Sequence, residues 1–126
     1  MQKIIVVVIA LTGLLLAQPA AAAPLGAGMF SGASNHDTSG SVTVSKQGDR
    51  YVVELGGDFS LDGAPDPYVA LGSRAKPVKG GLIAVLKSNK GAQSYAINAS
   101  TALAAANQVI IWCKKYSVPL GLAAIK

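Results

Sequence analysis

From Gly40 to the C-terminus, the chain consists of short apolar runs separated by loops rich in Gly, Pro and Asp. The first run, SGSVTVS, places Val42 and Val44 at alternate positions, which is the period of a β-strand with one buried face. A turn over residues 46–50 leads to YVVEL, and two such runs joined by a short glycine-containing turn predict a β-hairpin. Further apolar runs that predict strands occupy residues 67–71, 81–86, 94–97, 108–114 and 116–124.

The remaining segments add little helix. Residues 99–107 are alanine-rich and favour a short helix or an irregular crossover, because the segment is too short to be a stable helix alone. The run 81–86 is nearly all apolar, which predicts a central strand, whereas Pro119 and Gly121 predict that the last strand bulges or lies at an edge. We therefore predict an all-β fold, a single antiparallel β-sandwich or barrel-like domain of about seven or eight short strands with at most one short helix.

The first 23 residues have a different character. A positive start at Lys3 is followed by an apolar run over residues 4–17 and by the small-residue stretch QPAAAA, the order typical of a secretory signal peptide. A membrane-spanning helix needs about 20 apolar residues, and Pro19 ends this run too early. We predict a cleaved signal peptide at 1–23, a secreted or periplasmic β domain at 24–126, and no membrane span after cleavage.

The predicted mature domain is mildly basic. Without Lys3, ten Lys and Arg residues stand against six Asp and Glu residues, a net charge of about +4. The basic residues form no block of like charge and few aromatic residues lie between them, so no nucleic-acid partner is indicated. The charge is interpreted as a solubilising surface, and the alternative is attraction to an acidic surface or an acidic redox partner. Residues 24–35, rich in Gly, Ala and Ser, are interpreted as a loose lead-in in which Met29 and Phe30 could form a first short strand.

Five segments of the chain follow one another in a distinctive order. They are GMFSG (28–32), HDTSG (36–40), DFSLDGAPDPYVAL (58–71), KSNKGAQSYAI (87–97) and VIIWCKKYSVPLGLAAI (109–125). This series resembles the DM-thirteen domain family, whose domains carry a glycine–aromatic start, a His-x-x-Ser-Gly segment, a Phe…Gly-Pro-Asp loop, a Lys-Gly-x-Gln-x-Tyr turn and a closing Ile-Trp-Cys strand. The most specific pair in this chain is GAQSY followed by IWC. The resemblance implies a β-rich extracytoplasmic electron-transfer or redox module, of a kind found beside haem-binding or cytochrome modules, with its cysteine as the redox residue.

Cys113 is the only cysteine, so the domain cannot contain an internal disulfide. On a strand, Cys113 shares a face with Ile111 and Lys115, while Trp112 points to the other face. Lys115 would favour the reactive thiolate, whereas burial beside Ile111 would favour the neutral thiol. Four interpretations stay open: an inert core thiol, a redox or prosthetic-group-ligating thiol, an intermolecular disulfide that makes a dimer, and an enzyme nucleophile.

His36 is the only histidine and therefore the candidate partner of Cys113, although HDTSG also has the composition of a turn. One His and one Cys cannot form a closed zinc site, whereas either could be an axial haem ligand, so the cofactor is left unknown and no metal site is predicted. The aspartates at 58, 62 and 66 are interpreted as turn-forming residues, with calcium binding as the alternative. Enzymatic activity is uncertain and not favoured, because a cysteine nucleophile needs a histidine within hydrogen-bond reach.

The function predicted from the sequence is an exported redox or electron-transfer module. Cys113 is its candidate redox thiol, and Cys113 with His36 its candidate cofactor-binding pair. The predicted partner is a redox protein of the cell envelope, and a disulfide dimer through Cys113 is a further prediction. The alternative is a non-catalytic extracytoplasmic binding or adhesion β-module in which the cysteine only fills the core.

Overall fold

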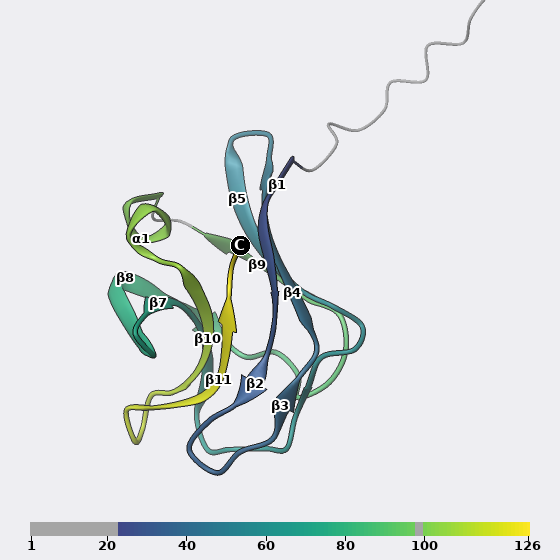
Figure 1. Ribbon diagram of the computed structural model, residues 1–126, viewed down its shortest axis with the longest axis vertical. Helices are drawn as coiled ribbons and strands as arrows, with labels where there is room; N and C mark the ends of the chain where they lie inside the picture. Colours follow the sequence, from purple (N-terminus) through teal and green to yellow (C-terminus); the bar gives the residue numbers. More distant parts are fainter. Residues whose placement is uncertain (1–22, 98–99) are drawn as a thin grey trace, which may run out of the picture.

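The computed structural model describes residues 23–97 and 100–126, so the predicted signal peptide lies, apart from Ala23, outside the described residues. The described chain forms two antiparallel sheets that pack as a sandwich (Figure 1). A four-stranded sheet has the order β1-β4-β5-β9, and a five-stranded sheet has the order β2-β11-β10-β7-β8. The four-stranded sheet contains β1 (Ala23–Met29), β4 (Ser41–Gln47), β5 (Arg50–Leu55) and β9 (Gln93–Ile97). The five-stranded sheet contains β2 (Ser31–Gly32), β7 (Pro67–Ser73), β8 (Lys76–Val85), β10 (Gln108–Cys113) and β11 (Val118–Ala124).

Three small elements complete the fold. The two-residue strands β3 (Thr38–Ser39) and β6 (Ser60–Leu61) pair with each other, and α1 (Ser100–Ala105) leads into β10. Eight of the described strands have five residues or more, and α1 is the one helix in this part of the chain. The all-β, antiparallel, sandwich-like prediction with one short helix is therefore confirmed. No helix among residues 23–97 and 100–126 has the length and apolar character needed to cross a bilayer.

Strand alternation explains the core. In the predicted hairpin, β4 pairs with β5 so that Val44 faces Val53, and both side chains are buried. In the opposite sheet, Ile111 of β10 pairs with Val69 of β7, and both are fully buried. Because successive side chains of a strand point to opposite faces, each strand contributes every second residue to the space between the sheets.

Two local predictions need correction. The run 81–86 was predicted to be central, but it lies in β8, the edge strand of the five-stranded sheet. Its apolar residues divide between the two faces: Ile83 packs against the core, while Leu82 and Val85 lie exposed. The predicted loose lead-in is also wrong, because β1 is a seven-residue strand paired along β4. The bulge predicted for the last strand is confirmed, since the register between β10 and β11 shifts where Pro119 lies opposite Trp112.

Candidate functional site

Cys113 is the last residue of β10 and points into the sandwich. It pairs with Pro67 on one side and Val118 on the other, and it belongs to the same buried cluster as Val109 and Ile111. Only 1% of its surface is exposed. Its Sγ–H donates a hydrogen bond to the carbonyl oxygen of Pro65 at 3.1 Å. The thiol therefore has a polar partner at the edge of the core, where a buried weak donor finds an acceptor.

The carbonyl that bonds this thiol belongs to a single loop. The loop runs from Asp62 to Asp66, connects β6 to β7, and is called here the cover loop. Pro65 and Asp66 are exposed. The loop backbone makes left-handed turns near both ends, at Gly63 (φ 110°) and Asp66 (φ 62°). Glycine adopts such a conformation without steric cost, and aspartate tolerates it better than most residues. The buried Cys113 thiol thus bonds the carbonyl of an exposed residue.

Hydrogen bonds hold both ends of the cover loop. At its start, Asp62 accepts from His36 Nδ1 at 2.9 Å and from the backbone N–H of Asp37 at 3.0 Å. The Asp62 N–H in turn donates to the Asp37 carbonyl at 3.0 Å. At its end, the N–H of Lys114 donates to the Asp66 carbonyl at 3.2 Å. Between these anchors, the Pro65 carbonyl is held by the Cys113 thiol.

The local sequence explains the anchor at Asp62. The strands β3 and β6 pair with Thr38 opposite Leu61, which brings the preceding HD dipeptide next to Asp62. The backbone hydrogen bond from Asp37, and secondly the side-chain hydrogen bond from His36, hold the pKa of Asp62 below its ordinary value. Both contacts favour the ionised carboxylate, so the anchor belongs to the charged form of Asp62.

The two site residues predicted from the sequence thus meet the same loop at different points. Cys113 bonds the carbonyl of Pro65, and His36 bonds the side chain of Asp62. No hydrogen bond joins His36 to Cys113. The predicted neighbour Lys115 is not on the strand, because β10 ends at Cys113; it lies in the following turn with its Nζ 5.5 Å from the centre of the Tyr116 ring. Trp112 points away from the thiol, as strand alternation requires.

The other aspartates of this region also make turn contacts. Asp58 accepts hydrogen bonds from the backbone N–H and hydroxyl of Ser41, which lower its pKa. These contacts agree with the interpretation of the aspartates as turn-forming residues. Among residues 23–97 and 100–126, no group of three or more His, Cys, Asp or Glu side chains could hold a metal ion.

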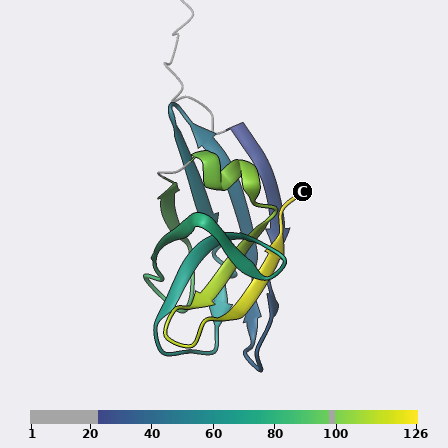
Figure 2. The ribbon, with the colours of Figure 1, turned by 90° about the vertical axis from the view of Figure 1, so that its left-hand side faces the viewer.

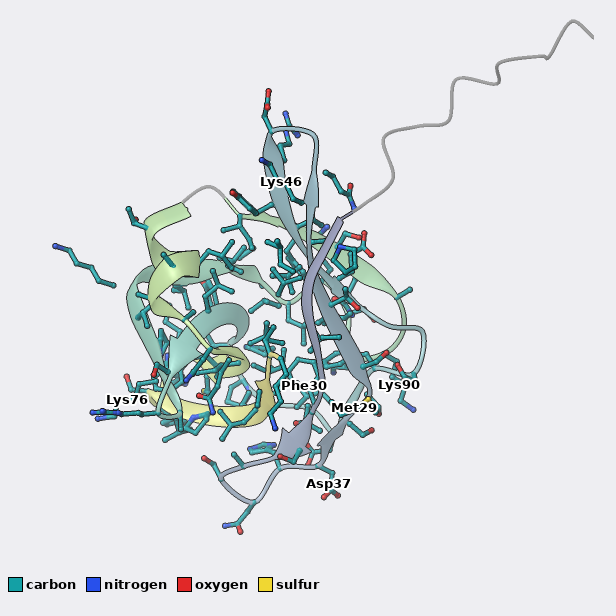
Figure 3. The ribbon with its side chains drawn as sticks, turned by 45° about the horizontal axis from the view of Figure 1, so that its top comes forward. Met29, Phe30, Asp37, Lys46, Lys76 and Lys90 are labelled. Carbon is teal, nitrogen blue, oxygen red and sulfur yellow. The ribbon has the colours of Figure 1, made fainter. Side chains whose placement is uncertain are left out.

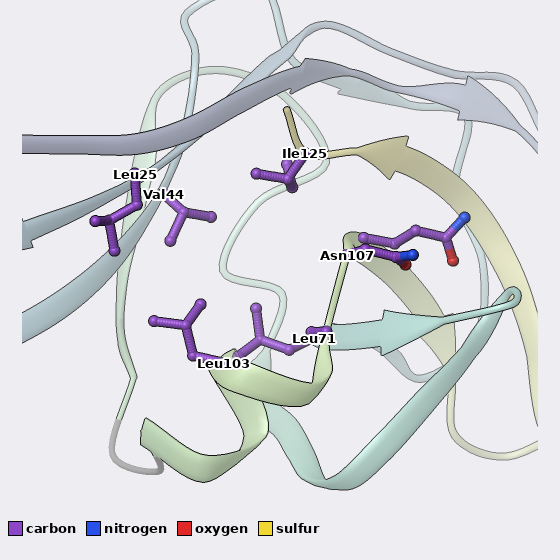
Figure 4. A pocket seen from close by; sticks show the side chains of 8 residues that line it. Leu25, Val44, Leu71, Leu103, Asn107 and Ile125 are labelled. Carbon is purple, nitrogen blue, oxygen red and sulfur yellow. The ribbon is translucent and has the colours of Figure 1, made fainter.

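A cavity of about 250 Å³ opens between the sheets near α1 (Figure 4). Gln108 at the start of β10 lines it, and Cys113 ends that strand, so the two lie about 17 Å apart along the strand. The lining contains no Cys, His or Met to ligate a haem iron. Cys113 Sγ bonds the Pro65 carbonyl and His36 Nδ1 bonds the Asp62 carboxylate, so the side chains as placed do not form a haem site. The lining residues are Leu25, Val44, Leu71, Leu103, Ala106, Asn107, Gln108 and Ile125.

The GAQSY segment is structural. The Tyr95 hydroxyl donates to Gln93 Oε1, and the N–H of Lys87 donates to the Tyr95 oxygen at 2.9 Å. Gln93 Nε2 donates to the Ser88 carbonyl at 2.9 Å. Burial raises the pKa of Tyr95. The segment therefore fixes the turn between β8 and β9.

What sequence reasoning missed at the site is the cover loop itself. The pattern DGAPD indicates turns, but only the fold shows that its Pro65 carbonyl lies over the thiol and that Asp62 is its anchor. A family model described as "Electron transfer DM13" matches residues 29–125, a span that includes His36, the cover loop and Cys113. Neither a curated protein nor a solved structure matched the chain. The chain therefore belongs to the Electron transfer DM13 family.

Proposed function

We propose that the chain is an exported electron-transfer module in which Cys113 is the redox-active group. Family membership supports a redox role. The signal-like composition of residues 1–23 supports export. The observation that carries the assignment to Cys113 is its contact: the only thiol of the chain is buried and bonds the carbonyl of Pro65, an exposed residue of the cover loop.

The closed loop shields the thiol and accepts its hydrogen bond at the Pro65 carbonyl. Opening of the cover loop removes the Pro65 acceptor and admits water, so the proton of Cys113 leaves to solvent. The resulting thiolate attacks one sulfur of a disulfide on a partner protein. A new S–S bond forms between Cys113 and that sulfur, and the second partner sulfur leaves as a thiolate. In this mixed disulfide the Cys113 sulfur is oxidised and one partner sulfur is reduced to a thiolate. A small-molecule thiol then attacks the Cys113 sulfur, forms a new disulfide with it and releases the partner as a dithiol. The two electrons that reduce the partner, a redox protein of the cell envelope, therefore come from Cys113 and from that thiol. A disulfide dimer of this chain would require the same opening.

The test uses oxidised glutathione as the disulfide probe and the native chain as the substrate. The expected product is a mixed disulfide at Cys113, detected as one added glutathione by intact mass and reversed by reduced glutathione. Cys113→Ser is the control for the site of addition. The decisive comparison is Asp62→Asn, which removes the charge of the loop anchor and should accelerate addition while the circular dichroism spectrum stays native. Equal rates for the wild type and Asp62→Asn would contradict the opening mechanism.

A second function is favoured by the burial of Cys113. In a binding or adhesion module the thiol only fills the core, as free cysteine commonly does. In that case Cys113→Ser changes the free energy of unfolding and nothing else, and glutathione addition is seen only in denaturant. An absorption spectrum of the protein purified from its host decides about a prosthetic group: a Soret band would show that a haem is bound.

A further inference from the structure

The outer face of the five-stranded sheet, turned away from the sandwich core, is apolar over two complete rows. Cys113 and Ile111 point inward, so Trp112 and Ile110 point outward. Strand register extends each of these residues into a row across four strands, and these strands face the viewer in Figure 2. The first row is Pro119, Trp112, Tyr68 and Val85, and the second row is Leu122, Ile110, Ala70 and Leu82.

The first row is partly open to solvent, whereas Ile110 and Ala70 in the middle of the second row are fully buried. Val85 is 56% exposed and Leu82 is 38% exposed, while Trp112 and Tyr68 are half-buried beside them. The outer face of a sandwich sheet ordinarily carries polar residues. A contiguous apolar patch rimmed by polar groups marks an interaction site. The Trp and Tyr at its centre are the residue types that dominate binding energy in protein interfaces.

Cations predominate around this face. All six Asp and Glu residues of the chain lie at or before Asp66, whereas β7, β8, β10 and β11 all come after it. Residues 67–126 contain eight Lys and Arg residues and no Asp or Glu. The cations are spread along the sequence, which is why no block of like charge is visible there, but the strand order places five of them on this sheet. Arg74 lies in the β7–β8 turn, Lys76 and Lys79 on β8, and Lys114 and Lys115 in the turn after β10. The exposed Asp66 borders them, since its backbone carbonyl accepts a hydrogen bond from the Lys114 N–H.

One of these cations is part of the apolar surface. Lys114 Nζ lies 5.3 Å from the centre of the Tyr68 ring. Such a contact holds a lysine over an aromatic face and keeps its charge at the edge of the patch. An acidic group on a partner would therefore meet a positioned ammonium beside Tyr68 and Trp112. We call the first row, together with Leu82 and Lys114, the docking face.

We propose that the docking face binds an acidic protein partner, through a segment that presents apolar and carboxylate side chains side by side. The exposed apolar residues supply the contact area, and the predominance of cations around them favours an acidic partner. A membrane fits less well, because Trp112 and Tyr68 are half-buried and leave little apolar surface to enter the acyl layer. A second copy fits less well, because two predominantly basic rims repel. The proposal does not depend on the redox role of Cys113, since it concerns the opposite face of β10.

The test probe is a synthetic extended peptide of about ten residues, spanning about 33 Å, in which Leu and Glu alternate. A matched peptide replaces every Glu with Lys. The chain has one tryptophan, so the indole N–H of Trp112 gives a single side-chain signal in a ¹⁵N–¹H spectrum. The acidic peptide should shift this signal and the amides of residues 82–85 in a saturable way, and added salt should weaken the effect. The basic peptide should leave both unchanged.

Variants locate the binding site. Val85→Glu and Lys114→Glu should each raise the Kd for the acidic peptide at least tenfold. Two matched control variants should change the Kd by less than twofold. Met29→Glu replaces another exposed apolar residue, which lies on β1 and is 63% exposed. Lys46→Glu replaces another lysine that lies over an aromatic ring, with its Nζ 5.9 Å from the Tyr51 ring centre. Figure 3 shows Lys46 and Met29 well away from Lys76, a cation of the rim.

Three results would overturn the proposal. The first is no saturable shift of the Trp112 signal with the acidic peptide, or an equal shift with the basic one. The second is binding to vesicles of anionic phospholipid that Val85→Glu abolishes, which would make the face a membrane surface. The third is a dimer in sedimentation velocity that Val85→Glu dissociates, which would make it a contact between copies. Loss of glutathione addition at Cys113 would leave this proposal intact, so the two are separable.

Discussion

Gly63→Ala should favour opening of the cover loop without creating a steric clash. Gly63 has φ 110°, and a Cβ built there lies 4.0 Å from its nearest neighbour, Asn89 Nδ2, so alanine meets no clash. The cost is therefore a backbone cost, because an L-residue is strained at this φ by about 1–2 kcal/mol. A change of that size multiplies an equilibrium constant about fivefold to thirtyfold. If opening of the cover loop exposes Cys113, the rate of its reaction should rise by the same factor.

The assay is the reaction of the native chain with a disulfide reagent such as 4,4′-dithiodipyridine, followed by absorbance at low reagent concentration. The single cysteine gives a single phase. Two glycines provide matched controls. Gly48→Ala introduces a side chain at another left-handed position, φ 62°, in the β4–β5 turn. Gly57→Ala adds a methyl group at a position outside the left-handed region. Neither added Cβ has a neighbour within 4 Å. Both controls should react like the wild type. The reasoning is refuted if Gly63→Ala reacts no faster, or if Gly48→Ala accelerates the reaction equally.

Three further predictions follow from the same contacts. Hydrogen bonds from Asp37 and His36 lower the pKa of Asp62, so the stabilisation of the loop by Asp62 is present above the ordinary value of 3.8 and is lost as pH falls through the lower folded value. Acid also removes thiolate and slows the reaction of any thiol. As pH falls through that range, the rate of the wild type should therefore rise relative to that of Asp62→Asn, and a constant ratio of the two rates would contradict the role of this anchor. Cys113→Ser should lower the free energy of unfolding by about 1–2 kcal/mol in urea titrations, because a hydroxyl replaces an apolar sulfur in the core; a loss above 4 kcal/mol would contradict the placement beside the Pro65 acceptor. The buried Thr38 hydroxyl donates to the Leu120 carbonyl at 2.7 Å, so Thr38→Val should lower the melting temperature by an amount equivalent to about 1–3 kcal/mol, and an unchanged melting temperature would show that this bond contributes nothing.

The longer strands could be predicted from the sequence because their alternation matches burial. Val42 and Val44 face the core while the residue between them does not, and that alternation is visible in the sequence alone. The first strand could not be predicted, because β1 has the Gly and Ala composition of a loop. Its glycines are required by the packing: a Cβ at Gly28 would lie 2.2 Å from the Ala124 carbonyl oxygen. The small residues of β1 therefore allow the C-terminal strand to pack closely against it.

At the candidate site, too, the sequence predicted strand alternation but not which distant residues come into contact. Strand alternation predicted that Cys113 and Trp112 point to opposite faces, and the structure agrees. The partners of Cys113 could not be predicted, because Pro65 is 48 residues away and reaches it only through the pairing of β6 and β7 with their neighbours. The position of β8 was predicted wrongly for a related reason. A run of apolar residues indicates burial on both faces, but here one of those faces carries the exposed Leu82 and Val85.

The urea dependence of the Cys113 reaction rate tests the central claim most directly. A local opening of the cover loop exposes little surface, so the rate should stay nearly flat at low urea and rise steeply only where the whole domain unfolds. A rate that climbs from zero urea with the full slope of global unfolding, at least about 1 kcal/mol per molar, would show that the thiol is reached only in the unfolded chain. That result would leave Cys113 as a packing residue and remove the electron-transfer role proposed for it.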